Sequence, residues 1–218
     1  KLAAGTIGSS KYCLTEAIKY AKSRKQFNKF LSEFEMIKEK IALMATRIYS
    51  LESMLYELVG NLDKKMVGFS KNDDKYADTF INLVQDFGIE CSALKVYGSE
   101  TLDFVGDESL QMLGGYGFCQ DYPIEKFYRD SRINRIFEGT NEINRLIIGG
   151  DIVRKTKKGK LPLLEEYKAI NTASFGRISN SDPWSILDRM KKTLILLAGE
   201  TITTNPTLIS ESQCVIRL

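Results

Sequence analysis

Apolar residues recur at alternating steps of four and three along residues 33–63, which is the period of one face of a helix. Polar and charged residues, among them Glu39 and Glu57, fall on the opposite face. We therefore predict a helix over 33–63, with Ser32 as its N-cap and its apolar face in the core of a helix bundle. The residues of that face are Ile37, Ile41, Met44, Ile48, Leu51, Leu55, Leu58 and Leu62.

A second apolar stripe runs from Phe80 to Val105, between a start signal, Asn-Asp-Asp at 72–74, and a stop signal at Gly114-Gly115. These bounds predict one continuous helix of about 39 residues, or roughly 58 Å at 1.5 Å per residue. Gly98 lies inside this helix, and a glycine there indicates a close crossing with another helix.

Two further helices are predicted over 2–23 and 140–156, with a loop and a short helix after Pro123 between the later elements. Small residues dominate the start of 2–23 and favour tight helix packing over direct ligand contact. No strand-like alternation of any length is present, so we expect no sheet. The predicted fold class is all-α, an up-down antiparallel four-helix bundle.

The basic stretch "RKTKKGK" at 154–160 is a polar break between two parts of the chain. It predicts a helical-bundle domain over 1–155, followed over 156–218 by a linker and the truncated start of an additional helical domain. In this second part, Asp182 and Pro183 begin another helix with an apolar stripe. That stripe comprises Trp184, Leu187, Met190 and Leu194.

The amino-acid composition excludes several classes of partner and of catalytic site. The net charge of +3 in 218 residues is too small to indicate a nucleic-acid partner, and no apolar run is long enough to span a bilayer. The four cysteines show no CxxC spacing and are expected to be free thiols. The chain contains no histidine, which excludes Ser-His-Asp and Cys-His catalysis within it. Proton transfer must therefore use a carboxylate, Lys, Tyr or Cys.

Three short stretches combine residues suited to an anionic, phosphate-bearing ligand: "SRKQFNKF" (23–30), "LQMLGGYGF" (110–118) and "IFEGTNEI" (136–143). Arg can pair with phosphate in a bidentate manner, glycines permit close backbone approach, and a helix N-terminus attracts anions. Each stretch also has a plain structural interpretation. Gly114-Gly115 can simply cap a helix, and Glu138 can simply favour a helix N-terminus. Arg129, Arg132 and Arg135 are better explained by ion pairs with Asp130 and neighbouring acids than by an anion track.

Taken together and in this order, the three stretches resemble the C-terminal helical domain of the FAD-dependent acyl-CoA dehydrogenases, over Lys1 to about Thr156. The resemblance implies that Glu138 is the catalytic base and that Gly139 lies beside the substrate thioester. It also implies that the cofactor FAD is contacted, in part across a subunit interface, by Arg24, Gln26, Phe27, Phe34, Gln111, Gly114, Gly115, Thr140 and Glu142.

Some positions depart from the common family pattern. Phe34-Glu35 stands where many members have His-Gln, and Glu142 stands where many have Gln. Phe34, the "EGTNE" wording and the extension past residue 160 look most like the very-long-chain branch, which carries an additional helical domain. The resemblance further implies that the family's N-terminal helical domain and middle β-domain would lie upstream of Lys1. We expect the chain alone to be inactive and to bind FAD weakly.

The function implied is α,β-dehydrogenation of fatty acyl-CoA in β-oxidation, with Glu138 taking the α-proton while a hydride leaves for the flavin. Such a base needs apolar burial to compete for a weakly acidic proton, and Ile136 and Phe137 suit that need. The implied partners are acyl-CoA, an electron-transfer flavoprotein and further copies of the chain in a dimer or tetramer. The implied location is the bacterial cytoplasm or, alternatively, the mitochondrial matrix or its inner membrane.

Two other functions are compatible with the residues. A helical oligomerisation module without chemistry would explain the apolar stripes but needs no acid in "IFEGT". An acyl-CoA oxidase would share the fold and the base but would let oxygen reach the reduced flavin.

Overall fold

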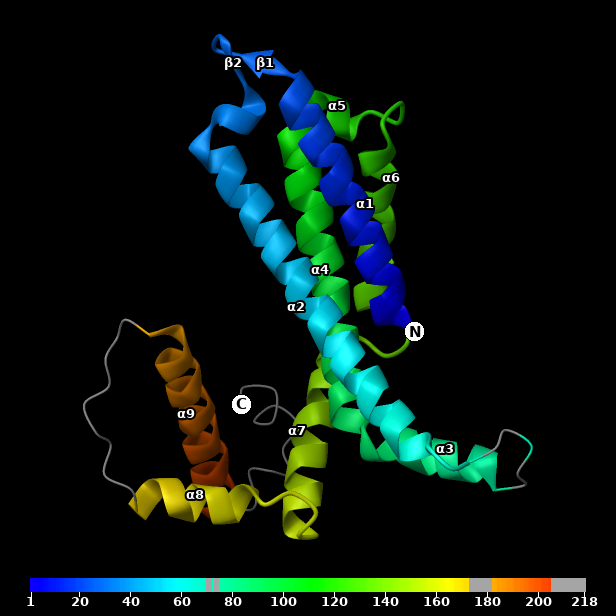
Figure 1. The fold of residues 1–218 in the computed structure, drawn as a ribbon, viewed down its shortest axis with the longest axis vertical. Helices are drawn as coiled ribbons and strands as arrows, with labels where there is room; N and C mark the ends of the chain where they lie inside the picture. The colour runs from blue at the N-terminus through cyan, green and yellow to red at the C-terminus, as the bar shows by residue number, and fades with distance from the viewer. Residues whose placement is uncertain (70–71, 73–74, 173–181, 205–218) are drawn as a thin grey trace. The chain divides into compact units, whose positions relative to one another are not determined.

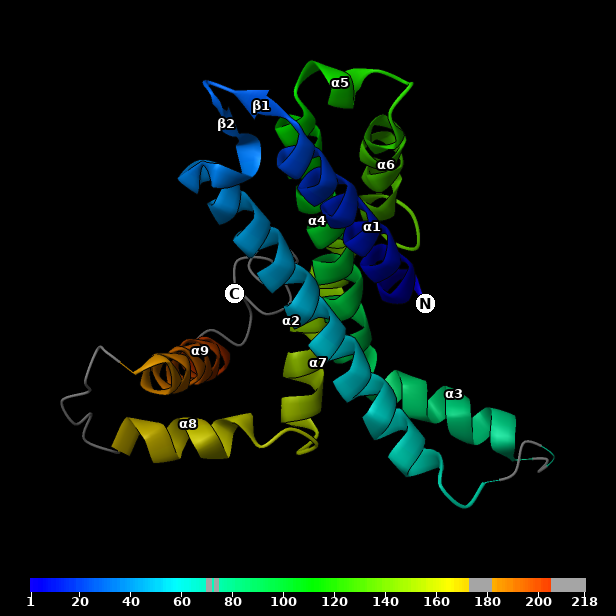
Figure 2. The ribbon, with the colours of Figure 1, turned by 45° about the horizontal axis from the view of Figure 1, so that its top comes forward.

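The computed structural model describes residues 1–69, 72, 75–172 and 182–204. The chain forms two compact units, Lys1–Asn144 and Arg145–Leu218. In the first unit, four helices lie side by side and alternate in direction (Figures 1 and 2). They are α1 (Leu2–Ser23), α2 (Glu35–Met66), α4 (Gly88–Leu113) and α6 (Pro123–Ser131). The predicted all-α class is therefore confirmed.

Two apolar clusters hold these helices together. The first joins α1, α2, α4 and α6 around side chains that include Cys13, Met44 and Val105, each fully buried. The second joins the start of α1 to α2 and α4 around Ala3, Leu51 and Leu94. The predicted apolar face of 33–63 supplies the α2 side of both clusters, while buried small residues of α1 allow close packing.

The predicted helix over about 39 residues is wrong as a single element, because the structure has α3 (Tyr76–Asp86) and then α4. Phe87 breaks the helix with φ −93° and ψ 22°, and Gly88, a weak helix former, follows it. Phe87 still packs against the second cluster, so the apolar period continues through the break. Asp73 and Asp74 of the expected start signal lie outside the described residues.

The start of α2 also differs from the prediction. Ser32 lies inside a 3-10 turn, η1 (Leu31–Glu33), and Phe34 is the residue that precedes α2, with an extended backbone. Ser32 is therefore not the N-cap. The side chain of Glu33 instead accepts a hydrogen bond from the N–H of Phe30 at 3.2 Å, which closes this turn.

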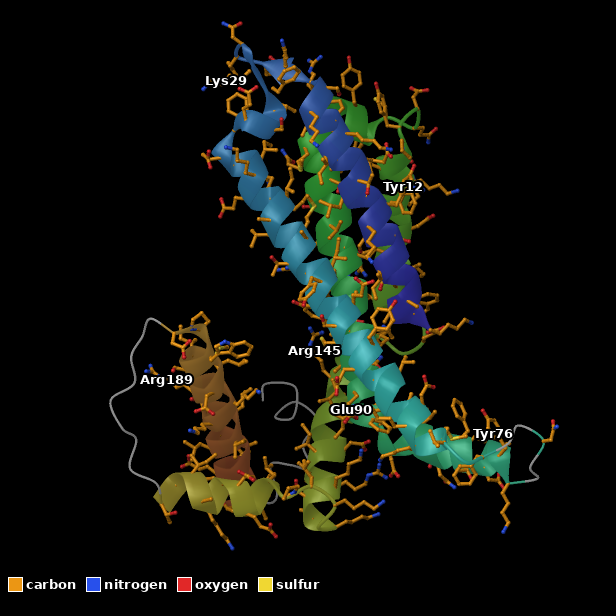
Figure 3. All side chains as sticks on the ribbon, viewed as in Figure 1. Tyr12, Lys29, Tyr76, Glu90, Arg145 and Arg189 are labelled. Atoms are coloured by element: carbon orange, nitrogen blue, oxygen red, sulfur yellow. The ribbon has the colours of Figure 1, made fainter. Side chains whose placement is uncertain are left out.

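The expectation of no sheet is wrong for one short hairpin between α1 and η1. Strands β1 (Lys25–Gln26) and β2 (Lys29–Phe30) pair antiparallel, and Lys29 marks the hairpin in Figure 3. Phe27 and Asn28 form the turn with φ values of 52° and 63°, as a two-residue hairpin turn requires. Strands of two residues are too short to leave an alternating pattern in the sequence.

The remaining elements complete the two units. In the first unit, α5 (Gly115–Phe118) precedes α6, and η2 (Arg132–Arg135) follows it. Helix α7 (Asn141–Lys157) begins at the end of the first unit and continues in the second, which also holds α8 (Leu163–Thr172) and α9 (Pro183–Thr204). Gly199 of α9 lies against the ring of Tyr167 of α8, where no larger residue would fit.

The stripe predicted for α9 is helical but exposed, with Trp184 at 77% and Met190 at 59%. The cysteines Cys13, Cys91 and Cys119 are free thiols as predicted, and Cys214 lies outside the described residues. Among the described helices, none combines the length and the apolar character that a membrane span requires.

Candidate functional site

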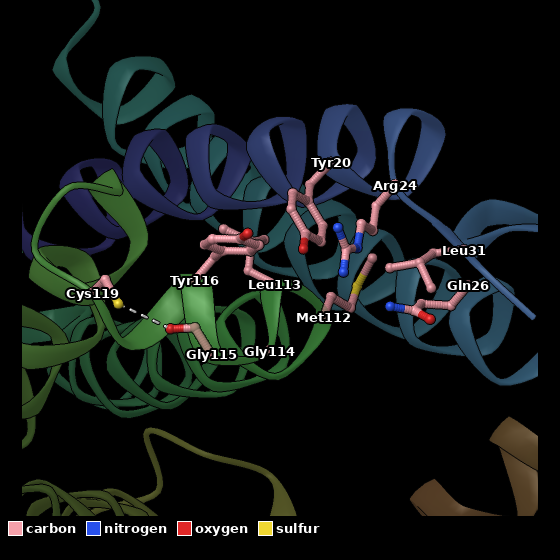
Figure 4. Close-up of a pocket in the computed structure, with 10 residues that line it drawn as sticks. All are labelled: Tyr20, Arg24, Gln26, Leu31, Met112, Leu113, Gly114, Gly115, Tyr116 and Cys119. Atoms are coloured by element: carbon pink, nitrogen blue, oxygen red, sulfur yellow. Dashed lines mark hydrogen bonds between the residues drawn. The ribbon is translucent and has the colours of Figure 1, made fainter.

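The first two of the three sequence stretches meet at one end of the first unit. The C-terminal end of α1 and the β1–β2 hairpin face the C-terminal end of α4 and α5 across a cavity of about 530 Å³ (Figure 4). Its lining residues are Tyr20, Arg24, Gln26, Leu31, Met112, Leu113, Gly114, Gly115, Tyr116 and Cys119. We call this the Arg24 cavity.

Helix ends build both walls of the Arg24 cavity. Helix α1 ends at Arg24, whose backbone turns to an extended conformation while its N–H donates to the Tyr20 carbonyl at 2.9 Å. Helix α4 ends at Gly114, whose φ of 60° and ψ of −139° suit glycine and few other residues. The opposite wall therefore exposes bare backbone, because a Cβ added at Gly114 or Gly115 would meet nothing within 4 Å.

Among the side chains that line the cavity, Arg24 supplies a cation and Gln26 an amide, and the others are mainly apolar or aromatic. The Cζ atom of Arg24 lies 5.9 Å from the centre of the Tyr116 ring, and Figure 4 shows its guanidinium beside the Tyr20 ring. Gln26 adds its amide from the hairpin. A guanidinium pairs with phosphate, and aromatic walls accept a flat ring. The donor set thus fits the phosphate and adenosine portion of a nucleotide cofactor.

Three other residues predicted to contact FAD do not line this cavity. Phe27 is 87% exposed at the tip of the hairpin, where its ring centre lies 6.5 Å from that of Phe34. Gln111 is exposed on α4, and its carbonyl accepts the N–H of Gly114 at 3.2 Å. The structure therefore brings Arg24 and Gln26 to the two glycines, and the lining of the cavity does not include Phe27, Phe34 or Gln111.

The third stretch forms a separate turn before α7, near the start of α4. Its residue Asn141 bonds to Lys95, whereas the Arg24 cavity lies near Met112, about 26 Å further along α4 at 1.5 Å per residue. Glu138 has a φ of 54° and Gly139 a φ of 81°. Left-handed backbone is costly for a residue with a side chain and is common at functional sites.

The residues after this turn fix the start of α7. The Thr140 hydroxyl accepts the N–H of Ile143 at 3.3 Å, so it acts as a helix cap in this chain. Glu142 lies in the first turn of α7. The predicted FAD-side roles of Thr140 and Glu142 stay predictions.

This chain by itself does not supply the expected apolar burial of Glu138, which stays a prediction for the full-length protein. Glu138 and Gly139 are exposed, and the neighbouring side chains Ile136 and Phe137 are 48% and 42% exposed. Within the described residues, these side chains therefore do not enclose the carboxylate. The arrangement presents an accessible carboxylate on a rigidly bonded turn.

A group of buried polar residues beside this turn was missed in the sequence. Lys95 is only 8% exposed, and its partner Asn141 is 2% exposed. Burial lowers the pKa of Lys95, while attraction to Glu138, Glu142 and Glu100 opposes that shift. The sequence did hold one signal of this group: Lys95 lies at the helical spacing of the buried residues of α4.

Ion pairing explains two of the three arginines at 129, 132 and 135, as predicted, although their partners are Glu125 and Asp103 and not Asp130. Arg129 Nε lies 3.3 Å from Glu125 Oε1, and Arg135 Nη2 lies 2.9 Å from Asp103 Oδ1. Within the described residues, no group of three or more acidic, cysteine or histidine side chains is placed to hold a metal ion.

Comparison with known proteins identifies the family. The family described as acyl-CoA dehydrogenase, C-terminal domain, matches residues 1–152. A probable acyl-CoA dehydrogenase of Bacillus subtilis (strain 168) is 48% identical over 170 residues, covering 78% of this chain and 29% of that protein. The mitochondrial very long-chain specific acyl-CoA dehydrogenase of Rattus norvegicus is 39% identical over 147 residues, covering 67% of this chain and 20% of that protein.

A solved structure matches a larger share of the chain than these two relatives do. The crystal structure of an acyl-CoA dehydrogenase complexed with FAD from Bacillus anthracis aligns with a TM-score of 0.88 and 38% identity, covering 99% of this chain and 38% of that one. The chain thus spans between 20% and 38% of the length of these three proteins. The predicted resemblance is confirmed: the chain belongs to the acyl-CoA dehydrogenase family, and residues 1–152 match its C-terminal domain.

Proposed function

We propose that the full-length protein is an FAD-dependent dehydrogenase of fatty acyl-CoA thioesters, in which Glu138 is the catalytic base. The family match and the FAD complex of the Bacillus anthracis relative support the reaction class and the cofactor. The observation that supports this role of Glu138 is its backbone conformation. A residue with a side chain is held at φ 54° with its carboxylate exposed, next to a glycine at φ 81°.

The Arg24 cavity supports the cofactor assignment. Arg24 would pair with phosphate oxygens of FAD, Gln26 would add an amide, and Gly114 and Gly115 would let the backbone approach closely. When bound, FAD supplies an acceptor for the hydride that leaves the β-carbon of the substrate.

The chain's own contribution to the reaction is proton removal. The Glu138 carboxylate takes the proton from the α-carbon, and the electron pair of that C–H bond forms the double bond between the α- and β-carbons. The two electrons of the β C–H bond leave with the hydride, so the products are an enoyl-CoA, a reduced cofactor and a protonated Glu138. Gly139 would lie beside the thioester, and its φ of 81° together with the Asn144 amide, 3.2 Å from where a Cβ would lie, favours glycine at this position.

The test uses the full-length protein purified with FAD, mixed with acyl-CoAs of increasing chain length in the absence of oxygen. Flavin absorbance at saturating substrate reports the reduction rate. We expect Glu138→Gln to retain FAD and to lower the rate by roughly 10²–10⁴-fold. Glu90→Gln is the matched control, because Glu90 is also an exposed carboxylate, in the first turn of α4, and it should keep the wild-type rate.

Each result discriminates between functions. Wild-type reduction rates in Glu138→Gln would show that the base assignment is wrong. No reduction of wild-type protein by any acyl-CoA, despite bound FAD, would favour a role in assembly alone. Reoxidation by an electron-transfer flavoprotein would support the proposed dehydrogenase, whereas hydrogen peroxide formed in proportion to product would favour an acyl-CoA oxidase.

A further inference from the structure

We propose that Lys95 is a positioning residue for Glu138, because its buried ammonium group fixes the start of α7 through Asn141 and thereby the turn that carries the carboxylate. This inference rests on the proposed function, since it assumes that Glu138 takes the α-proton. Lys95 acts through other residues and is not itself assigned to contact the substrate.

The first link joins α4 to the first residue of α7. Lys95 Nζ donates to Asn141 Oδ1 at 2.8 Å. The amide Nδ2 of Asn141 in turn donates to Ser99 Oγ at 2.9 Å and to Glu100 Oε1 at 3.1 Å. Ser99 is fully buried and Asn141 is 2% exposed, so water does not compete readily for these bonds. The side chain of Asn141 is thus held at both its oxygen and its nitrogen.

The second link joins the start of α7 to the turn. Asn144, which is 7% exposed, donates from Nδ2 to the carbonyls of Gly139 at 2.9 Å and Thr140 at 3.1 Å. The backbone N–H of Asn144 also bonds to the Thr140 carbonyl at 2.9 Å. The two residues that separate Glu138 from α7 are therefore tied to the helix. This bonding offsets the unfavourable left-handed backbone at Glu138.

Charge explains why a lysine suits this position. Glu138, Glu142 and Glu100 are the three carboxylates whose attraction acts on Lys95, and they oppose the lowering of its pKa that burial causes. A neutral side chain at 95 would remove the charged donor to Asn141 Oδ1 and leave only the longer bond from Ser99 Oγ at 3.2 Å. It would also remove the attraction between the Lys95 ammonium and the Glu138 carboxylate.

The test compares variants of the full-length protein loaded with FAD, with the same anaerobic reduction by a saturating long-chain acyl-CoA. We expect Lys95→Met to lower the reduction rate constant per bound FAD by about 10- to 100-fold, with the Kd of the acyl-CoA changed less than about threefold. Lys95→Arg, which keeps the charge and the donors, should recover most of that rate. A lysine that only stabilises the fold would lower the yield or the FAD content but not this rate constant.

Lys40→Met is the matched control. Lys40 of α2 is ion-paired with Glu108 of α4, which lies about 20 Å along that helix from Lys95. This variant loses a charged link between helices of the same unit but should keep the wild-type rate constant. Backbone hydrogen exchange gives an independent measurement, because the peptide covering 136–147 should exchange faster in Lys95→Met and not in Lys40→Met.

Several outcomes would overturn the inference. A wild-type rate constant and unchanged exchange of 136–147 in Lys95→Met would do so, as would an equal loss of rate in Lys40→Met. If Lys95→Met is recovered without FAD, Asn141→Ala tests the same link with the charge retained, and a wild-type rate there also overturns it. If Glu138→Gln is as fast as wild type, the proposed function itself fails. A slow Glu138→Gln with a fast Lys95→Met refutes only the positioning role.

Discussion

Thr6 of α1 and Gly98 of α4 lie in close contact where the two helices cross. A Cβ placed on Gly98 would lie 2.9 Å from Thr6 Oγ1 and 3.3 Å from the Cα of Ala3. Thr6 is 3% exposed, and its hydroxyl is held by a 2.9 Å bond to the Ala3 carbonyl. Neither neighbour can move away without disturbing α1, so the absence of a side chain at Gly98 sets the distance between these helices.

Gly98→Ala should therefore destabilise the protein although alanine is the better helix former. Overpacking costs about 1–3 kcal/mol, and the gain in helix propensity offsets up to about 1 kcal/mol of it. Gly106→Ala is the control in the same helix, since its Cβ would meet only Tyr128 backbone atoms at 3.7 Å or more. Urea unfolding should show a lower free energy of unfolding for Gly98→Ala and an equal or higher one for Gly106→Ala. Equal stability of both variants would contradict the close crossing.

The spacing of apolar residues in the sequence predicted some elements of this fold and missed others. The period of apolar residues predicted α2 and the core side of α4, because burial on one helix face leaves a repeat near 3.6 residues. The same repeat concealed the break at Phe87, since that ring stays in phase with the second apolar cluster. The β1–β2 hairpin escaped prediction because positive φ at Phe27 is set by the turn and is rare for an aromatic residue.

The sequence predicted the motifs of the candidate site but missed some of the residues that shape it. Motif order located the stretches around Arg24, Gly114 and Glu138, and the structure unites the first two in one cavity. The sequence predicted the ends of α1 and α4 correctly, but it did not predict the β1–β2 hairpin, in which Gln26 lines the cavity and Phe27 does not. Lys95 was overlooked because its role depends on Asn141, 46 residues later, and periodicity carries no information about such a pairing.

Cys13 provides a prediction about pH. Burial raises the pKa of this thiol from its ordinary value of 9.0 to about 12. Between about pH 9 and pH 12 the unfolded chain therefore releases a proton that the folded protein retains, and the free energy of unfolding falls as pH rises through this window. We expect that fall to be shallower in Cys13→Ala, measured by urea unfolding at successive pH values.

The slope with pH carries this test, because Cys13→Ala also leaves a small cavity that lowers stability at every pH. Cys119→Ala is the control, since Cys119 is exposed and its removal should leave the slope of the wild type. Parallel curves for wild type and Cys13→Ala above pH 9 would show that the thiol of Cys13 ionises as readily in the folded state as in the unfolded state.

The Arg24 cavity leads to a prediction about cofactor affinity, measured by flavin fluorescence on the full-length apoprotein titrated with FAD. Arg24→Met should raise the Kd about 10- to 100-fold, because a charge-assisted hydrogen bond contributes roughly 1.5–3 kcal/mol. The Kd of Arg24→Lys should lie between those of the wild type and Arg24→Met, since an ammonium group cannot bind phosphate in a bidentate manner. Arg129→Met, which removes a 75%-exposed arginine paired with Glu125, should leave the Kd unchanged. Equal Kd values for wild type and Arg24→Met would place the phosphates of FAD outside this cavity.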